Sequence, residues 1–331
     1  MALLCCVRSS LRVAAPLLKT LQGVVLLAGL AACGAPVTQV PVATGREGQR
    51  LQVVTTVLPI TLLTRAVAAD CAVVTALLPA GAGPHGFQAS PSDLVALRRA
   101  RVVIKNGLGL EPFLDKLVIA AGNPRLQVID ASADVTPLVP GEGSPLHAAD
   151  QVEHRHGDAN PHVWLDPLRA AQQVRAIREA LVQLDPGCAA GYRRQAADLE
   201  ARLVSLNRAI AAELKPYRGR TFVALHAVAP YFAERYGLKA EDLVAVPEQN
   251  PSPADLQRVE ATVRRHRLRA LLSEPLQNRR SFEALARDLG IGLRVFDPIE
   301  TAASEQAAHD PETYFKAMRR NATQVRQVFS D

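Results

Sequence analysis

From Leu51 onward the chain alternates short apolar runs with segments whose apolar residues recur every three or four positions. Short apolar runs predict buried strands, and the intervening periodic segments predict helices. The predicted strands are Leu51–Val57, Val73–Leu78, Arg101–Lys105 and Leu126–Asp130 in the first half, then Thr221–Leu225, Asp242–Val246, Ala270–Ser273 and Arg294–Phe296 in the second. Such alternation is typical of a mostly parallel sheet covered by helices.

The predicted helices occupy the segments between these strands. They are Leu62–Ala69, a helix capped by Ser90 and Ser92 that runs through Arg99, a helix from Asp166-Pro167, and then Val228–Tyr236, a helix opened by Pro251–Pro253 that runs through Arg265, Ser281–Leu289 and Pro311–Phe329. A longer stretch, Pro186–Leu214, keeps one apolar stripe at Leu199, Leu203, Leu206 and Ile210. We therefore expect an α/β fold of two Rossmann-like lobes with parallel sheets, residues 51–185 and 216–331, joined by a long rigid helix over 186–215.

The N-terminus has the pattern of an export signal. Basic residues precede the apolar run Leu21–Ala32, which is too short for a comfortable membrane span. The run ends in Leu30-Ala31-Ala32-Cys33, which resembles the lipoprotein box of bacteria, in which the cysteine carries the lipid. We expect residues 1–33 to be signal peptide and lipobox, with lipidation at Cys33, and residues 34–50 to be a tether. The alternative is an ordinary signal peptide with an incidental cysteine.

Composition indicates a globular protein and argues against nucleic-acid binding. Hydrophobic residues make up 48% and charged residues 21% of the chain. Basic and acidic residues are interspersed, and aromatic residues are only 4%, so no stacking platform is visible. Arg8, Arg12 and Lys19 lie in the predicted signal peptide and account for half of the net charge of +6. The mature protein is then only slightly basic.

Two cysteines, Cys71 and Cys188, remain after the predicted processing. They can pair in an oxidising compartment or stay as two separate buried thiols, because sequence does not show proximity.

Three histidines and one aspartate occupy comparable places in the pattern. His85 comes after the predicted strand Val73–Leu78, His162 just before a helix cap, and His226 directly after Thr221–Leu225. Asp297 directly follows the strand Arg294–Phe296. In open α/β sheets ligands bind beyond the carboxyl ends of strands, so these four side chains converge if the two lobes face each other. Three imidazoles and one carboxylate suit tetrahedral zinc.

The motifs around these residues are similar to those of the metal-binding lipoproteins of zinc and manganese ABC importers. They are Gly83-Pro84-His85, Pro91-Ser92-Asp93, Asn106–Glu111, Pro161–Pro167, Phe222–His226, Tyr231-Phe232-Ala233 and Phe296-Asp297-Pro298. The resemblance implies a metal held between two lobes, with His85, His162, His226 and Asp297 at the family's four ligand positions. Three residues depart from the family pattern. Gly83 and Asn160 stand where an acidic residue is common, and Phe87 stands where Tyr is common.

A loop over Ala131–Pro161 carries His147, His154 and His156. Zinc-type members of the family often have a histidine-rich loop in this place, so these residues are candidates for accessory metal capture. The alternative is a polar loop without a metal role.

The resemblance implies an extracytoplasmic, lipid-anchored monomer that gives its metal to the permease and ATPase of an ABC importer, without catalysis. Zn2+ is the expected metal because His226 stands where manganese-selective relatives carry a carboxylate; Mn2+ is the alternative. The alternative functions are a zinc-dependent hydrolase, which needs an open coordination position, and a lipoprotein adhesin or scaffold.

Overall fold

A computed structural model describes residues 50–138, 159–275 and 280–330 of the chain. Cys33 and the three loop histidines, His147, His154 and His156, lie outside these residues. Among the described residues, no helix combines the length and the apolar character needed to cross a membrane. From Gly45 onward the chain forms one compact unit.

The first half of this unit contains a four-stranded parallel sheet with the strand order β2-β1-β3-β4. Its elements are β1 (Leu51–Thr55), α1 (Leu58–Ala68), β2 (Ala72–Ala76), α2 (Pro91–Arg99), β3 (Val102–Lys105), α3 (Leu114–Ala121), β4 (Gln127–Asp130), η2 (Val163–Leu165) and α4 (Pro167–Leu184). Val53 pairs with Val74 on one side and Val102 on the other. These positions are buried or half-buried, which explains the apolar runs in the sequence.

The second half repeats the arrangement with the strand order β6-β5-β7-β8. Its elements are β5 (Thr221–His226), α6 (Pro230–Tyr236), β6 (Lys239–Val244), α7 (Pro253–His266), β7 (Ala270–Ser273), α8 (Arg280–Asp288), β8 (Gly292–Val295), α9 (Glu305–His309) and α10 (Glu312–Ser330). All strand pairs in both sheets are parallel. The predicted fold class is therefore confirmed.

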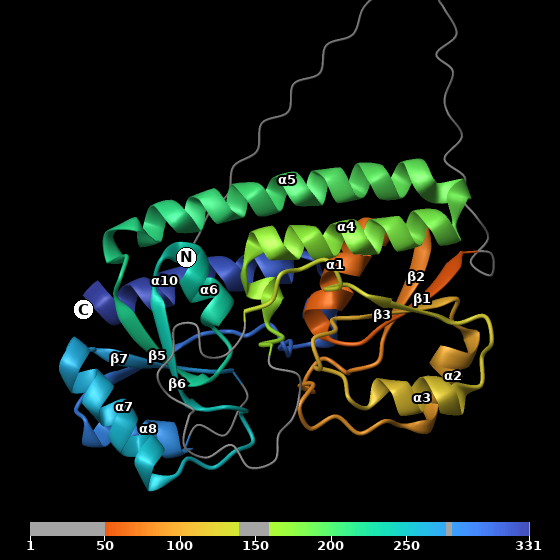
Figure 1. The fold of residues 1–331 in the computed structure, drawn as a ribbon. Helices are drawn as coiled ribbons and strands as arrows, with labels where there is room; N and C mark the ends of the chain where they lie inside the picture. The colour runs from red at the N-terminus through yellow and green to blue at the C-terminus, as the bar shows by residue number, and fades with distance from the viewer. Residues whose placement is uncertain (1–49, 139–158, 276–279, 331) are drawn as a thin grey trace, which may run out of the picture. The chain divides into compact units, whose positions relative to one another are not determined.

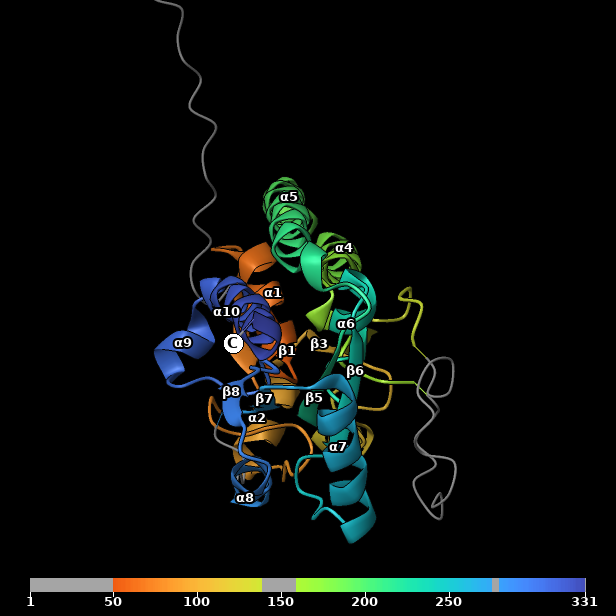
Figure 2. The ribbon, with the colours of Figure 1, turned by 90° about the vertical axis from the view of Figure 1, so that its left-hand side faces the viewer.

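A long helix passes along both halves. After η3 (Pro186–Cys188), α5 (Ala189–Leu214) runs beside α4 and reaches η4 (Lys215–Tyr217), which leads into β5. Figures 1 and 2 show α4 and α5 side by side, and α5 also packs against α1 and α10. The predicted stripe Leu199, Leu203, Leu206 and Ile210 is buried. This burial fixes α5 to helices of both halves, as expected of a rigid connector.

Several boundaries differ from the prediction. The first helix begins at Leu58 rather than Leu62, because Pro59 suits a first helical turn and Leu58 and Ile60 are buried. Strand β6 begins at Lys239 rather than Asp242, since Lys239 pairs with Thr221 despite its polar character. The helix α3 was not predicted.

A disulfide joins Cys71, in the turn before β2, to Cys188, just before α5. The two residues are 117 positions apart, with 6.1 Å between their Cα atoms. The open question of their pairing is thus answered by the fold, and the bond ties α5 to the first sheet.

Candidate metal centre

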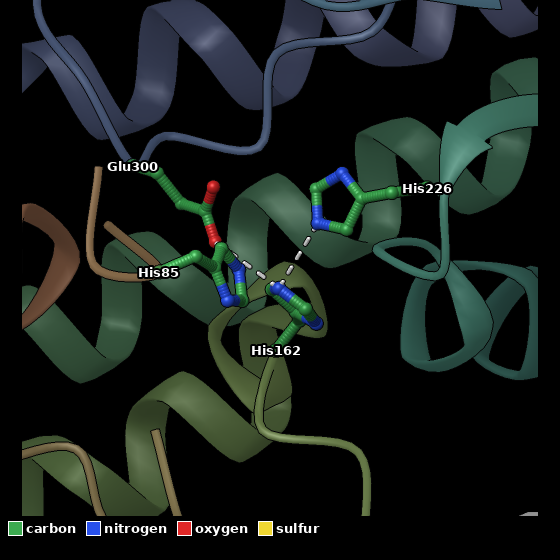
Figure 3. A group of neighbouring side chains, drawn as sticks. All are labelled: His85, His162, His226 and Glu300. Atoms are coloured by element: carbon green, nitrogen blue, oxygen red, sulfur yellow. Dashed lines mark hydrogen bonds and ion pairs between the residues drawn. The ribbon is translucent and has the colours of Figure 1, made fainter. Parts of the chain in front are cut away.

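Three histidines and one glutamate converge between the two sheets. The candidate ligand atoms of His85, His162, His226 and Glu300 lie within 4.8 Å of one another, and this is the metal-competent group of His, Cys, Asp and Glu side chains found in the described residues. Figure 3 shows the three imidazoles and the carboxylate turned toward a common centre. His162, His226 and Glu300 are buried and His85 is half-buried.

Three of the separations between candidate ligand atoms are close to those that a tetrahedral ion requires. Nε2 of His162 lies 3.1 Å and Nε2 of His85 3.3 Å from Oε1 of Glu300. Nε2 of His226 lies 3.4 Å from Nε2 of His162. Ligands about 2.0 Å from a tetrahedral zinc ion stand roughly 3.3 Å apart. The side chains are therefore already close to the spacing at which they can share one ion.

Asn160 fixes the orientation of His162. The side-chain amide of Asn160 donates to the carbonyl of Ala227 at 2.6 Å, which leaves Oδ1 of Asn160 to accept from Nδ1 of His162 at 3.0 Å. With its proton on Nδ1, neutral His162 turns the lone pair of Nε2 toward Glu300. Burial lowers the pKa of His162 to about 4, against the opposing effect of the nearby Glu300 carboxylate, so the ring is neutral at neutral pH.

Glu274 fixes His226 in the same way. It follows β7 directly, and its Oε1 lies 2.5 Å from Nδ1 of His226, with both side chains buried. Nε2 of His226 is thereby aimed at the centre. Burial lowers the pKa of His226, but the charge and hydrogen bond of Glu274 outweigh it and raise the pKa above its ordinary value. A proton on Nε2 can then stand in the place of a metal ion.

Glu300 carries the negative charge of the group. Burial raises its pKa, but the close approach of the imidazoles of His162 and His85 outweighs burial and holds the pKa well below the usual range. Its second oxygen, Oε2, is buried and has no hydrogen-bond partner within the described structure. An ionised, half-satisfied carboxylate facing imidazole lone pairs is the electrostatic environment that a cation stabilises.

Asp297, which the sequence predicts as the fourth ligand, does not belong to the cluster of candidate ligand atoms among the described residues. Its Oδ1 accepts from the backbone N–H of Ile299 at 2.8 Å, and its Oδ2 lies 3.4 Å from Nη2 of Arg320. Ile299 has a φ of 62°, which is unusual for a β-branched residue. Asp297 thus shapes the turn after β8, and Glu300, three residues later, reaches the three histidines.

Trp164 connects two of the segments that carry the group. Its indole N–H donates to the carbonyl of Pro298 at 2.8 Å, and its ring centroid lies 5.2 Å from that of His162. It therefore packs beside the site and joins the His162 segment to the turn that presents Glu300.

Two further histidines, His266 and His309, lie among the described residues. His266 ends α7, and Nδ1 of His309 bonds the carbonyl of Glu305 at the end of α9. Neither belongs to the metal-competent cluster of the described residues. Sequence reasoning missed Glu274 and Glu300, although Glu274 follows a strand directly, as His226 was expected to.

Comparison with known proteins gives this geometry a context. The chain is 28% identical over 280 residues to the zinc-binding lipoprotein AdcA of Streptococcus pneumoniae. The alignment covers 84% of this chain but only 56% of AdcA. The chain is 26% identical over 278 residues to the high-affinity zinc uptake system protein ZnuA of Bacillus subtilis, covering 84% and 86% of the two chains. The chain thus spans about half of one relative and most of the other.

A solved structure and a family agree with these relatives. The Zn(II)-bound ZnuA-like domain of Streptococcus pneumoniae AdcA is 27% identical and matches with a TM-score of 0.69, covering 85% of this chain and all of that domain. Residues 53–328 match the family described as the periplasmic component A of the zinc-uptake complex. This match covers most of the chain, both sheets and the four clustered side chains, and the chain therefore belongs to the ZnuA family of periplasmic zinc-uptake components.

Proposed function

We propose that the protein captures a divalent transition metal outside the cytoplasm, with His85, His162, His226 and Glu300 as its ligands, and delivers it to the permease and ATPase of an ABC importer. The observation that carries this proposal is the orientation of the two buried imidazoles. Asn160 and Glu274 occupy both Nδ1 atoms, so the two Nε2 atoms face each other and Glu300 with nothing but a proton or a cation to bridge them.

A carrier fits the group better than a hydrolase does. Three imidazoles and one carboxylate complete a tetrahedron, which leaves no position for a reactive water. A hydrolase also needs a free general base beside that water. Glu274, a further carboxylate that contacts a histidine of the group, is committed to Nδ1 of His226. The relatives of this family are transport components, in keeping with binding and release rather than turnover.

Zinc is the preferred metal in this proposal. Imidazole nitrogen suits zinc, whereas manganese prefers oxygen ligands and a higher coordination number. A site with three nitrogens and one carboxylate therefore favours zinc on ligand type as well as on the natural order of affinities. The names of the relatives from Streptococcus and Bacillus, which describe zinc binding and zinc uptake, support the same choice.

In this proposal metal reaches the group through a cavity that Glu300 lines. The cavity has a volume of about 900 Å³, and carboxylates from both halves line it, including Asp93, Glu248 and Glu305. Acidic walls attract cations toward Glu300. The accessory histidines His147, His154 and His156 and the lipid on Cys33 remain proposals that rest on the sequence.

Metal analysis of the full chain tests the proposed function. Protein purified without added chelator should carry one zinc per chain, and competitive titration should give tighter binding of zinc than of manganese. His226→Ala should weaken zinc binding strongly, while His266→Ala, outside the group, serves as the matched control. An adhesin or scaffold does not need to bind metal. The absence of bound metal in both measurements would therefore overturn the proposal. Equal or tighter binding of manganese would make it a manganese carrier.

A further inference from the structure

Four exposed arginines gather at the amino-terminal edge of the first sheet. Arg98 and Arg99 end α2, Arg101 precedes β3, and Arg125 lies two residues before β4. We call them the arginine patch. The register places them together, because the N–H of Arg101 donates to the carbonyl of Gln52 and the N–H of Gln127 donates to the carbonyl of Arg101. No ion pair joins any of the four to a carboxylate of the described residues.

The patch is held in place by backbone contacts. The guanidinium of Arg101 donates to the carbonyl of Arg125, and Nε of Arg98 donates to the carbonyl of Ala121 at 3.3 Å. The amide of Asn123 donates to the carbonyls of Leu97, Arg98 and Ala100, which fastens the loop before β4 to the end of α2. Like charges are thus fixed side by side, and an anionic surface would relieve their repulsion.

Exposed aliphatic side chains accompany the arginines. Ile119, in the last turn of α3, is 79% exposed, and Val95 and Val128 are each 43% exposed. Val95 precedes Arg98 and Arg99 by three and four positions, so the three residues share one face of α2. Figure 1 shows α2 and α3 next to each other, and the two helices are in contact. Guanidinium groups beside aliphatic side chains suit a lipid interface, which offers phosphates and acyl chains together.

The segment that leads from the predicted lipid anchor joins the described structure at this same edge. Strand β1 begins at Leu51, and residues 34–50 connect it to Cys33. A tether of this length reaches at most about 55 Å when fully extended, at roughly 3.3 Å per residue. The amino-terminal edge of the first sheet is therefore the part of the described chain that is tethered closest to the membrane, and the effective concentration of lipid there is high.

We propose that the arginine patch and Ile119 rest on anionic lipid headgroups of the membrane that holds the anchor. The metal group lies beyond the opposite, carboxyl ends of the strands, since His85 follows β2 and Glu300 follows β8. Contact through the patch would leave the first half with its metal-binding end directed away from the lipid. This orientation suits the capture of free metal. The benefit of the orientation, unlike the lipid contact itself, rests on the proposed function.

Depth-dependent fluorescence on the full lipidated chain tests the contact. The variant is Ile119→Cys, and its lipidation at Cys33 is verified by mass spectrometry. A polarity-sensitive fluorophore is attached to the new thiol. Vesicles contain spin-labelled lipid and either phosphatidylcholine alone or phosphatidylcholine with phosphatidylglycerol. We expect lipid quenching of the fluorophore in the anionic vesicles, with loss of quenching at high salt. The matched control is Val246→Cys, an exposed valine of the second half, which should stay unquenched.

Charge reversal separates the patch from the anchor. Arg98→Glu with Arg99→Glu should abolish quenching at position 119 while the chain stays on the vesicles through its lipid. Zinc stoichiometry of this double variant should be unchanged, so a failure of the metal proposal is distinguishable from a failure of this one. Equal quenching in both kinds of vesicle, or none in anionic vesicles, would overturn the inference. If the fluorophore at position 119 reports an apolar environment in native membranes but in neither kind of vesicle, the inference is overturned, and the patch is assigned to an acidic protein instead.

Discussion

Oε1 of Glu274 lies 2.5 Å from Nδ1 of His226, and both side chains are buried. The contact selects which nitrogen of His226 faces the metal group, and it supplies a negative charge behind the ring. Carboxylates that hold a metal-ligating histidine in this way tune both its orientation and its basicity.

Glu274→Gln should therefore weaken zinc binding without abolishing it. Glutamine keeps an oxygen that can accept from Nδ1 of His226, but it removes the charge. We expect a loss of affinity of about 10- to 100-fold, or about 1.4 to 2.7 kcal/mol, measured by competitive titration at pH 7. Glu283→Gln, in α8 of the same half, is the control and should bind as the wild type does. An unchanged affinity in Glu274→Gln would show that the contact is merely structural.

Zinc binding near neutral pH should release a proton from His226. Its pKa is raised above the ordinary histidine value, so the metal-free ring keeps a proton that the metal must displace. His162, whose pKa is lowered to about 4, is already neutral and contributes none. The release should approach one proton per zinc just below the pKa of His226 and vanish well above it.

Calorimetric titration in buffers of different ionisation enthalpy measures this release. In Glu274→Gln the charge that raises the pKa of His226 is gone, so proton release at pH 7 should fall. Equal release by the variant and the wild type would mean that the proton comes from another group.

Asp297 should matter through the turn that it holds rather than through its charge. Asp297→Asn keeps an oxygen for the N–H of Ile299, and we expect zinc affinity within about threefold of the wild type. Asp297→Ala loses that bond and frees a strained turn, so affinity should fall by about tenfold or more. Equal and large losses in both variants, measured by the same titration, would instead make Asp297 a ligand.

Loss of the disulfide should destabilise the fold but spare the metal group. Closing a loop of 117 residues is worth about 5 kcal/mol in the chain-entropy description. Cys71→Ser with Cys188→Ser should lower the free energy of unfolding by that amount in urea denaturation of the metal-free protein. Its zinc affinity should stay near that of the wild type. A stability equal to that of the wild type would contradict the pairing.

The sequence was sufficient for the fold and for the three histidines because both depend on local patterns. Apolar runs predicted, to within a few residues, all eight strands found in the described part of the chain, and parallel strands bring their carboxyl ends to one edge. Each of the three histidines lies beside such an end or beside a helix cap. The helix α3 was missed even though Gly122, in the left-handed region, caps it.

Glu300 could not be found by the same rule. The rule that ligands directly follow a strand favours Asp297. The chain makes a further turn after Asp297 before it reaches Glu300, whose carboxylate faces the histidines. That turn depends on Ile299 adopting a positive φ, which no propensity favours in a β-branched residue. The pairing of Cys71 with Cys188 was likewise beyond the sequence, because it depends on how α5 returns to the first sheet.

Zinc titration of Glu300→Gln tests the central claim most directly. Glutamine keeps the size of the side chain but removes the negative charge that faces His85 and His162. Competitive titration at neutral pH should show a loss of zinc affinity of at least about 100-fold relative to the wild type, or about 2.7 kcal/mol or more. Wild-type affinity in Glu300→Gln would contradict a site built from three histidines and Glu300.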